Sequence, residues 1–173
     1  LIMPRYKITI EYLGTDFVGW QKQENGKSIQ EELERAIYQF SQENTNVCGS
    51  GRTDAGVHSL GQVAHFDLQK AYPPKVVKNA INHFLSSLAI SVIDCEEVSG
   101  DFHARFSAKK RHYLYRLIIR DAKLVLDYNR AWRINNNLDI EKMRKAASYL
   151  IGTHDFSSFR ASMCQASSPI KTL

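Results

Sequence analysis

The sequence YKITIEY at residues 6–12 alternates strictly between apolar and polar side chains. In an extended chain, this alternation places Tyr6, Ile8, Ile10 and Tyr12 on one side. A period of two is typical of a β-strand that buries one face and exposes the other. We therefore expect a strand at 6–12 whose apolar side packs against the core of a sheet-based domain.

The segments that follow this strand alternate between helical and extended patterns. A capping box at 28–31 predicts the start of one helix, and Pro73-Pro74 predicts the start of a second. Further strands are predicted near 46–48, at 62–68 and at 88–98. The resulting order, β-α-β-β-α-β over residues 4–100, predicts a ferredoxin-like domain with an antiparallel sheet.

Residues 101–173 begin to repeat this pattern. An alternating strand is predicted at 113–119, a short strand at 130–134 and an amphipathic helix at 139–151. Only 22 residues follow this helix, which is too few to complete a second β-α-β-β-α-β unit. The predicted fold class is therefore α+β, with two ferredoxin-like halves that have antiparallel sheets. The second half, 101–173, is expected to be incomplete, so the chain is interpreted as a fragment.

Composition narrows the class of protein. Hydrophobic residues make up 43% of the chain and charged residues 24%, which is ordinary for a globular protein and excludes a disordered one. No apolar run is long enough to cross a membrane. The three cysteines lack a CxxC pair, and the six histidines lack a short metal-ligand spacing. We therefore expect a cytoplasmic protein without a disulfide framework or a metal site.

Positive charge is concentrated in one stretch of the chain. The net charge is +5, and residues 102–120 contain six Lys or Arg residues but no Asp or Glu. Aromatic residues lie between these basic residues, a pattern that suits phosphate neutralisation and base stacking on a nucleic acid. A solvated, charged strand and turn explains the same composition equally well.

Residues 49–61, GSGRTDAGVHSLG, contain four of the nine glycines and are called the glycine loop below. Arg52 and Asp54 lie two positions apart within it. An adjacent arginine favours the ionised form of a carboxylate, which a nucleophile or a general base needs. A structural Arg–Asp pair that braces the loop explains this spacing equally well. His58 is interpreted as a residue that makes a structural hydrogen bond or positions backbone or substrate.

Four motifs give the chain a resemblance to a known family. GRTDAGVH at 51–58, followed by GQVAHF at 61–66, closely resembles the signature of the TruA family of tRNA pseudouridine synthases. GTDFVGWQ at 14–21, DFHARFSAKKRHYLY at 101–115 and GTHDFSSFRA at 152–161 resemble further family motifs in the same order.

The resemblance implies an enzyme, an isomerase that converts uridine to pseudouridine at positions 38, 39 and 40 in the anticodon stem-loop of tRNA. It also implies two ferredoxin-like halves with the active site in the cleft between them. The partners implied are tRNA, bound by its anticodon arm, and a second copy of the chain in a homodimer. No cofactor is implied, because the reaction breaks and remakes a bond without oxidation or group transfer.

The resemblance also assigns roles to individual residues. Asp54 matches the catalytic carboxylate, Arg52 an arginine that holds the target base out of the stack, and Tyr113 a tyrosine that stacks on the uracil. Tyr115 is predicted to be a core residue. The predicted RNA-binding residues, from the motifs and from local charge, are Phe102, His103, Ala104, Arg105, Phe106, Lys109, Lys110, Arg111, Met163, Cys164, Gln165, Ala166 and Ser167.

Two alternatives remain open at this point. A truncated tRNA-binding module or pseudoenzyme would keep the basic stretch but lack a complete active site. A general single-strand RNA-binding domain would explain the charge pattern, although it gives no reason for the motif at 51–58. The resemblance places a further basic residue of the active site beyond residue 173, so the 173-residue chain alone is expected to bind tRNA weakly and to be inactive.

Overall fold

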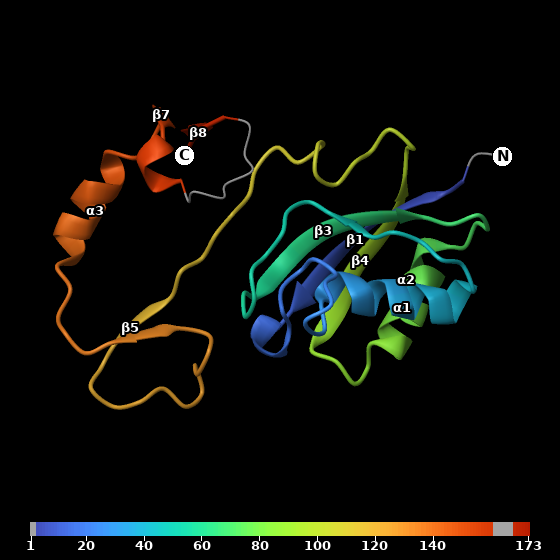
Figure 1. The fold of residues 1–173 in the computed structure, drawn as a ribbon, viewed down its shortest axis with the longest axis horizontal. Coiled ribbons are helices and arrows are strands. Elements are labelled where there is room, and N and C mark those ends of the chain that lie inside the picture. Colours follow the sequence, from blue (N-terminus) through green and yellow to red (C-terminus); the bar gives the residue numbers. More distant parts are fainter. Residues whose placement is uncertain (1–2, 161–167) are drawn as a thin grey trace. The chain divides into compact units, whose positions relative to one another are not determined.

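The computed structural model describes residues 3–160 and 168–173 (Figure 1). The chain forms two compact units. The first comprises Leu1–Tyr115 and Asp127–Arg130, and the second comprises Arg116–Leu126 and Ala131–Leu173. The predicted division into domains at 4–100 and 101–173 remains a prediction.

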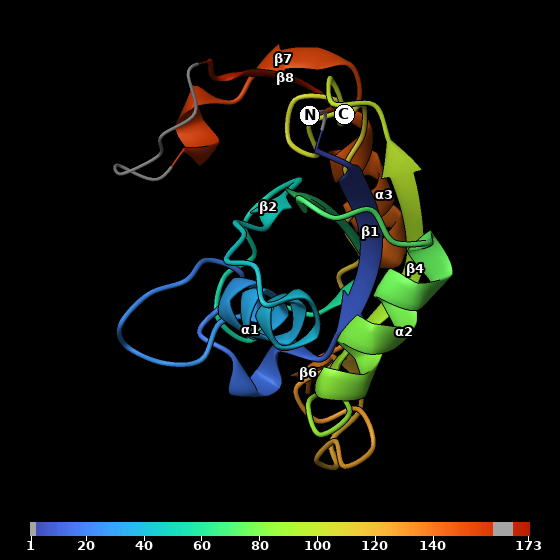
Figure 2. The same cartoon turned by 90° about the vertical axis from the view of Figure 1, so that its right-hand side faces the viewer.

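A four-stranded antiparallel sheet is the basis of the first unit. Its strands are β1 (Arg5–Tyr12), β2 (Cys48–Gly49), β3 (Ser59–Asp67) and β4 (Ile90–Val98). Their order across the sheet is β2-β3-β1-β4, so β1 lies between β3 and β4 (Figure 1). Two helices complete the predicted order β-α-β-β-α-β: α1 (Ile29–Ser41) and α2 (Pro74–Phe84) (Figure 2).

The alternation in β1 explains how the core forms. The side chains of Tyr6, Ile8 and Ile10 are completely buried, whereas the polar residues between them face the other side of the strand. The buried side chains form one core with apolar residues of both helices, so α1 and α2 cover the same face of the sheet. Burial of each large apolar side chain contributes about 1.5–3 kcal/mol relative to an exposed position.

The predicted start of the first helix is confirmed in atomic detail. The hydroxyl of Ser28 accepts a hydrogen bond from the backbone N–H of Glu31 at 3.2 Å, which satisfies a donor that the first helical turn leaves free. The helix ends at Ser41, because the next residue, Gln42, has a left-handed φ of 60° that stops the helical path. The second helix begins at Pro74, as predicted.

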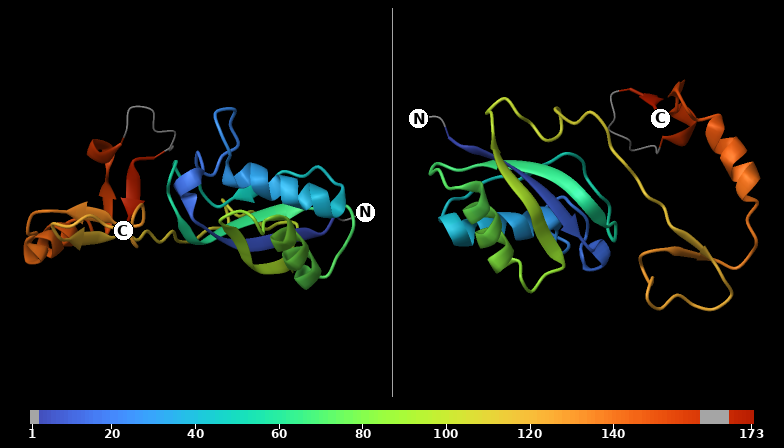
Figure 3. Two further views of the ribbon diagram at one scale, coloured as in Figure 1. Left: turned by 90° about the horizontal axis from the view of Figure 1, so that it is seen from below. Right: turned by 180° about the vertical axis from the view of Figure 1, so that it is seen from behind.

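The second unit contains shorter elements. They are β5 (Leu117–Ile119), β6 (Trp132–Ile134), α3 (Ile140–Ser148), β7 (Thr153–Asp155) and β8 (Ile170–Thr172). Strands β7 and β8 form an antiparallel pair (Figure 3). Helix α3 begins where Asp139 accepts a hydrogen bond from the backbone N–H of Lys142. None of the described residues of this unit is buried.

Three predictions for the second half were wrong. The strand predicted at 113–119 forms only at 117–119. Tyr115 is not a core residue, because 77% of its surface is exposed. Strands β5 and β6 pair in parallel, not in an antiparallel arrangement. A parallel pair requires a crossover connection, and the segment from 120 to 131 provides one here.

No helix in the part of the chain that the structure describes combines the length and the apolar character that crossing a membrane requires.

Candidate active site

The glycine loop runs from the end of β2 into the start of β3, and the segment after β1 holds its backbone. That segment forms a short 3-10 turn, η1 (Gly14–Asp16), and continues to Trp20. The N–H of Trp20 donates to the carbonyl of Thr53 at 2.9 Å. At the end of β1, the hydroxyls of Tyr12 and Thr53 lie 2.9 Å apart in a hydrogen bond. Two motifs that lie more than thirty residues apart in sequence therefore form one structure.

Two glycines of the 14–20 segment allow this close approach. A Cβ atom at Gly14 would lie 2.0 Å from the carbonyl oxygen of Val57, so any side chain there would displace the glycine loop. Gly19 has a φ of +112°, and a Cβ atom at this position would lie 2.5 Å from the carbonyl oxygen of Thr53. Gly14 and Gly19 thus allow the backbone of the 14–20 segment to approach the backbone of the glycine loop.

The loop presents Asp54 at a tight turn. The N–H of Val57 donates to the carbonyl of Asp54 at 3.2 Å, and Gly56 adopts a positive φ of 78° inside this turn. The side chains of Asp54 and Arg52 are both exposed. Among the described residues, no ion pair or hydrogen bond joins these two side chains, so an Arg–Asp brace does not hold the loop. Backbone contacts and the hydrogen bond between Tyr12 and Thr53 hold it, and they leave the carboxylate accessible.

One basic residue contacts the glycine loop directly. The guanidinium of Arg111 donates to the carbonyl of Ser50 at 2.8 Å, and its Nε lies 3.5 Å from the position of a Cβ at Gly51. The structure therefore brings the start of the glycine loop and the basic stretch together. Tyr113 follows two residues later, and 88% of its surface is exposed. Lys109 and Lys110 are also exposed.

The predicted RNA-binding stretch at 102–106 divides into two parts. Ala104 is 2% exposed, and its N–H donates to Nδ1 of His65 at 3.2 Å. The ring of His103 packs on the ring of His65, with centroids 4.7 Å apart. Arg105 and Phe106, by contrast, extend into solvent, with the guanidinium 5.9 Å from the ring centroid. The first part attaches the segment to the sheet, and the second part is available to a ligand.

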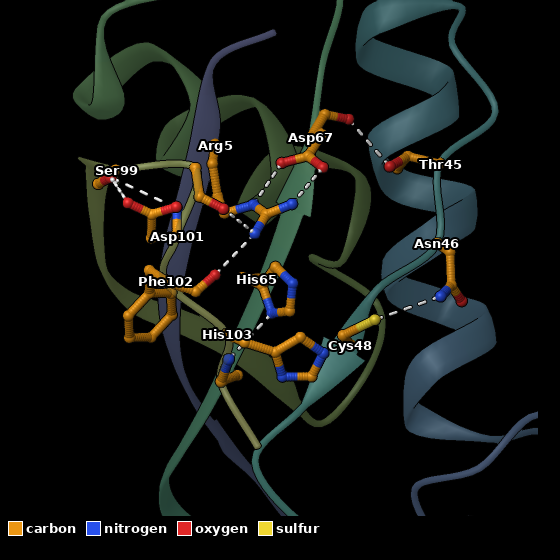
Figure 4. A network of polar contacts seen from close by, with 12 residues as sticks. Arg5, Thr45, Asn46, Cys48, His65, Asp67, Ser99, Asp101, Phe102 and His103 are labelled. Carbon is orange, nitrogen blue, oxygen red and sulfur yellow. Dashed lines mark hydrogen bonds and ion pairs between the residues drawn. The ribbon is translucent and has the colours of Figure 1, made fainter. Parts of the chain in front are cut away.

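A group of three metal-ligating side chains was not predicted from the sequence. The potential ligand atoms of Cys48, His65 and His103, called the polar cluster below, lie within 4.8 Å of one another (Figure 4). The residues come from three distant segments, so no ligand spacing could reveal them. A cavity of about 470 Å³ beside the cluster is also lined by Arg5 and Asp67, but not by Asp54.

The hydrogen bonds of the polar cluster oppose metal binding. Nδ1 of His65 accepts the N–H of Ala104, and Nδ1 of His103 accepts the N–H of Arg105 at 3.2 Å. Each neutral ring therefore carries its own proton on Nε2. A metal at Nε2 would force the proton to Nδ1, where a backbone N–H already points.

Electrostatics supports the same conclusion. Burial, followed by the positive charge of Arg5, lowers the pKa of His65, and burial raises the pKa of the Cys48 thiol. Both shifts favour the uncharged forms of His65 and of the Cys48 thiol. The thiol also accepts a hydrogen bond from the side chain of Asn46 at 3.3 Å.

The remaining predicted RNA-binding residues, Met163, Cys164, Gln165, Ala166 and Ser167, lie outside the described residues.

Comparison with known proteins gives consistent matches. A sequence model of a family described as "tRNA pseudouridine synthase" matches residues 8–107. The tRNA pseudouridine synthase A of Ehrlichia canis is 58% identical over 170 residues, which cover 98% of this chain and 69% of the relative. Proteins of the same name from Ehrlichia chaffeensis and Ehrlichia ruminantium (strain Welgevonden) are 59% and 57% identical, with the same coverage.

Proposed function

We propose that this chain, which belongs to the tRNA pseudouridine synthase family, is an isomerase that converts uridine to pseudouridine in tRNA. The observation that carries the proposal is the accessible carboxylate of Asp54. It lies on a loop whose position is fixed by backbone contacts and not by partners of the carboxylate itself. A rigid backbone with a free functional group is the arrangement that positioned catalysis requires.

The reaction breaks the bond between N1 of uracil and C1′ of the ribose, rotates the base, and joins C5 to C1′. A proton leaves C5 and N1 gains one, so the composition of the nucleotide does not change. The carboxylate of Asp54 can act on the ribose as a nucleophile or on C5 as a base, and both roles need its ionised form. Because nothing is oxidised or transferred, we propose that the reaction needs no cofactor.

The exposed side chains near the glycine loop suit a flipped base. A uridine in the anticodon arm must leave the base stack before a side chain can reach C1′ or C5. The exposed ring of Tyr113 offers a face on which the extruded uracil can stack. The exposed guanidinium of Arg52 can occupy the space that the base leaves. Lys109 and Lys110 can neutralise neighbouring phosphates.

Family resemblance supports the finer parts of the proposal. These are modification at positions 38, 39 and 40 of tRNA, a homodimer that binds the anticodon arm, and action in the cytoplasm.

The decisive experiment measures tritium release from tRNA that carries [5-³H]uridine, using the protein expressed from its complete gene. Pseudouridine-selective labelling followed by mass spectrometry then locates the modified positions. We expect one tritium released for each modified uridine, and no release from the Asp54→Asn variant. Asp94→Asn, at an exposed position of the edge strand β4, is the matched control and should retain full activity.

Two outcomes would contradict the proposal. Turnover of Asp54→Asn within about tenfold of the unchanged protein would remove Asp54 from the catalytic role. Binding of tRNA without any tritium release by the unchanged protein would instead support the alternative, a tRNA-binding module without a complete active site.

A further inference from the structure

The imidazole of His58 connects three segments of the first unit. Nδ1 lies 2.8 Å from the backbone nitrogen of Gly14, in the segment after β1. Nε2 lies 2.5 Å from the backbone oxygen of Asn129, in the connection between β5 and β6. Gly14 and Asn129 are 44 and 71 residues away from His58 in sequence, so these contacts are tertiary and do not arise from a local turn.

These two partners determine the protonation of the ring. A backbone N–H can only donate, so Nδ1 must accept and carry no proton. A backbone carbonyl can only accept, so Nε2 must carry the proton and donate. Both bonds form only when His58 is neutral and has its proton on Nε2. The ring therefore has one orientation and one tautomer.

The contact at Gly14 lies close to the turn that carries Asp54. The carbonyl of Val57, adjacent to His58, occupies the space that a side chain at Gly14 would need. The N–H of Val57 closes the turn by donating to the carbonyl of Asp54. A shift of the His58 ring would therefore move the backbone of Val57 and, through this bond, the turn at Asp54.

The backbone at Asn129 is set up to receive the other bond. Its φ of 59° is left-handed, a conformation that asparagine adopts more readily than β-branched residues do. The carbonyl oxygen of this residue lies within hydrogen-bond distance of Nε2 of His58.

We propose that His58 is a positioning residue for Asp54. His58 acts through two hydrogen bonds, one from Gly14 to its Nδ1 and one from its Nε2 to Asn129. This inference rests on the proposed function, because it assigns a role in that reaction. His58 does not need to touch the tRNA. Its effect is expected in kcat, because a displacement of about 1 Å of a catalytic group can lower a rate about 100-fold.

The test uses three substitutions that remove the two bonds separately and together. His58→Asn keeps an acceptor near the position of Nδ1, His58→Gln keeps a donor near the position of Nε2, and His58→Ala keeps neither. We expect His58→Ala to lower kcat about 100-fold and each amide variant to lower it about 10-fold. KM for tRNA should change less than about threefold. His83→Asn, on the exposed end of α2, is the matched control and should keep its kcat.

A spectroscopic measurement tests the same geometry without using activity. In a ¹⁵N NMR spectrum at neutral pH, His58 should show a protonated Nε2 and an unprotonated Nδ1. The amide of Gly14 should exchange slowly with solvent in the unchanged protein and faster in His58→Ala. If His58→Ala does not fold, Asn129→Val replaces it, because valine disfavours the left-handed backbone and should lower kcat while the histidine stays in place.

The outcomes separate the inference from the proposed function. A proton on Nδ1 of His58, or a kcat for His58→Ala and Asn129→Val within about twofold of the unchanged protein, would overturn the inference alone. If the unchanged protein showed no turnover, the proposed function would be contradicted, and the NMR result would still test the geometry of His58.

Discussion

The glycine loop and the polar cluster both lie on the first unit, and both contain chemically reactive side chains. In the glycine loop, backbone contacts and the side chains of Thr53 and His58 hold the chain, whereas the exposed carboxylate of Asp54 is not among these contacts. In the polar cluster, the side chains themselves make the hydrogen bonds. His65 and His103 each accept a backbone N–H, and Cys48 accepts one from a side-chain amide.

This difference separates a group that is available for chemistry from groups that serve structure. The polar cluster adjoins Arg5, whose guanidinium donates to both oxygens of Asp67 at 2.7 and 2.8 Å. The same guanidinium donates to the carbonyls of Gly100 and Phe102. The side chains of this region therefore attach residues 100–104 to the sheet. Reactive residue types therefore do not by themselves indicate an active site, and their hydrogen-bond partners show which of them are committed to structure.

The largest predicted effect comes from one matched pair of substitutions, Asp54→Asn and Asp67→Asn. Asp54→Asn should lower kcat more than about 1,000-fold, because it removes the charge that we propose acts in catalysis, while the midpoint of urea unfolding stays unchanged. Asp67→Asn should lower the free energy of unfolding and leave kcat within about threefold. A loss of stability in Asp54→Asn would place Asp54 with the structural group and contradict the comparison.

The next largest effect is expected at Arg5. Arg5→Met removes four hydrogen bonds of a half-buried guanidinium and should lower the free energy of unfolding by about 2–3 kcal/mol. Arg5→Lys should recover only part of this loss, because an ammonium group cannot reproduce the planar fork. Urea unfolding of both variants measures the difference. Equal stability of the methionine variant and the unchanged protein would show that this network is not structural.

Substitution of Tyr113, like that of Asp54, should lower activity and leave stability nearly unchanged. Its ring is almost fully exposed, so substitution should leave stability within about 0.5 kcal/mol. Stacking on a base is worth about 1–3 kcal/mol, so Tyr113→Ala should lower kcat/KM about 5- to 150-fold. Tyr113→Phe keeps the ring face and should retain most of the activity. Equal losses in the two variants would instead identify the hydroxyl as the essential group.

Sequence patterns predicted the local features of the first unit well. The alternation in β1 predicted its buried face, and Ser28 predicted the start of α1, because both signals depend on neighbours within a few residues. The prediction of a strand at 113–119 was wrong at Tyr113 and Tyr115, which lie outside β5. Alternation alone does not form a strand, since strand pairing needs a partner, and only 117–119 has one.

The candidate site was only partly predictable, for a related reason. The composition of the glycine loop and the motif at 51–58 indicated Asp54 without any tertiary information. Sequence spacing could not show whether Arg52 pairs with Asp54, and the structure shows no such pair among the described residues. The contacts of His58 and the assembly of the polar cluster join segments dozens of residues apart, and no local pattern encodes them.

The basic stretch allows a smaller, graded test. Lys109 and Lys110 are exposed, whereas Arg111 donates to the glycine loop. Replacing both lysines by alanine should flatten the salt dependence of tRNA binding by roughly 0.7–0.9 log units for each lost phosphate contact. Arg111→Ala should lower kcat, because it removes a contact with the glycine loop, and should change the slope less than the double lysine variant does. Filter-binding titrations from low to physiological salt measure the slopes, and an unchanged slope in the double variant would show that these lysines face bulk solvent.

The smallest predicted effect concerns the pH dependence of stability at His65. Burial lowers the pKa of His65, an effect to which Arg5 and His103 add and which Asp67 opposes. As the pH falls below the ordinary value of 6.5, the unfolded chain therefore binds a proton that the folded chain does not. The free energy of unfolding should consequently decrease below pH 6.5, and this loss should level off once the pH falls below the lowered pKa of the folded state.

His65→Asn tests this sign directly. It keeps an acceptor for the N–H of Ala104 but cannot titrate, so its stability should change less than that of the unchanged protein as the pH falls from 7.5 through 6.5. Urea unfolding at closely spaced pH values measures both curves, and His83→Asn controls for the loss of an exposed histidine. Parallel curves for His65→Asn and the unchanged protein would show that His65 takes up its proton as readily in the folded chain as in the unfolded one. In that case the burial of His65 would not disfavour its charged form, and this residue of the polar cluster would take up a proton like an exposed group.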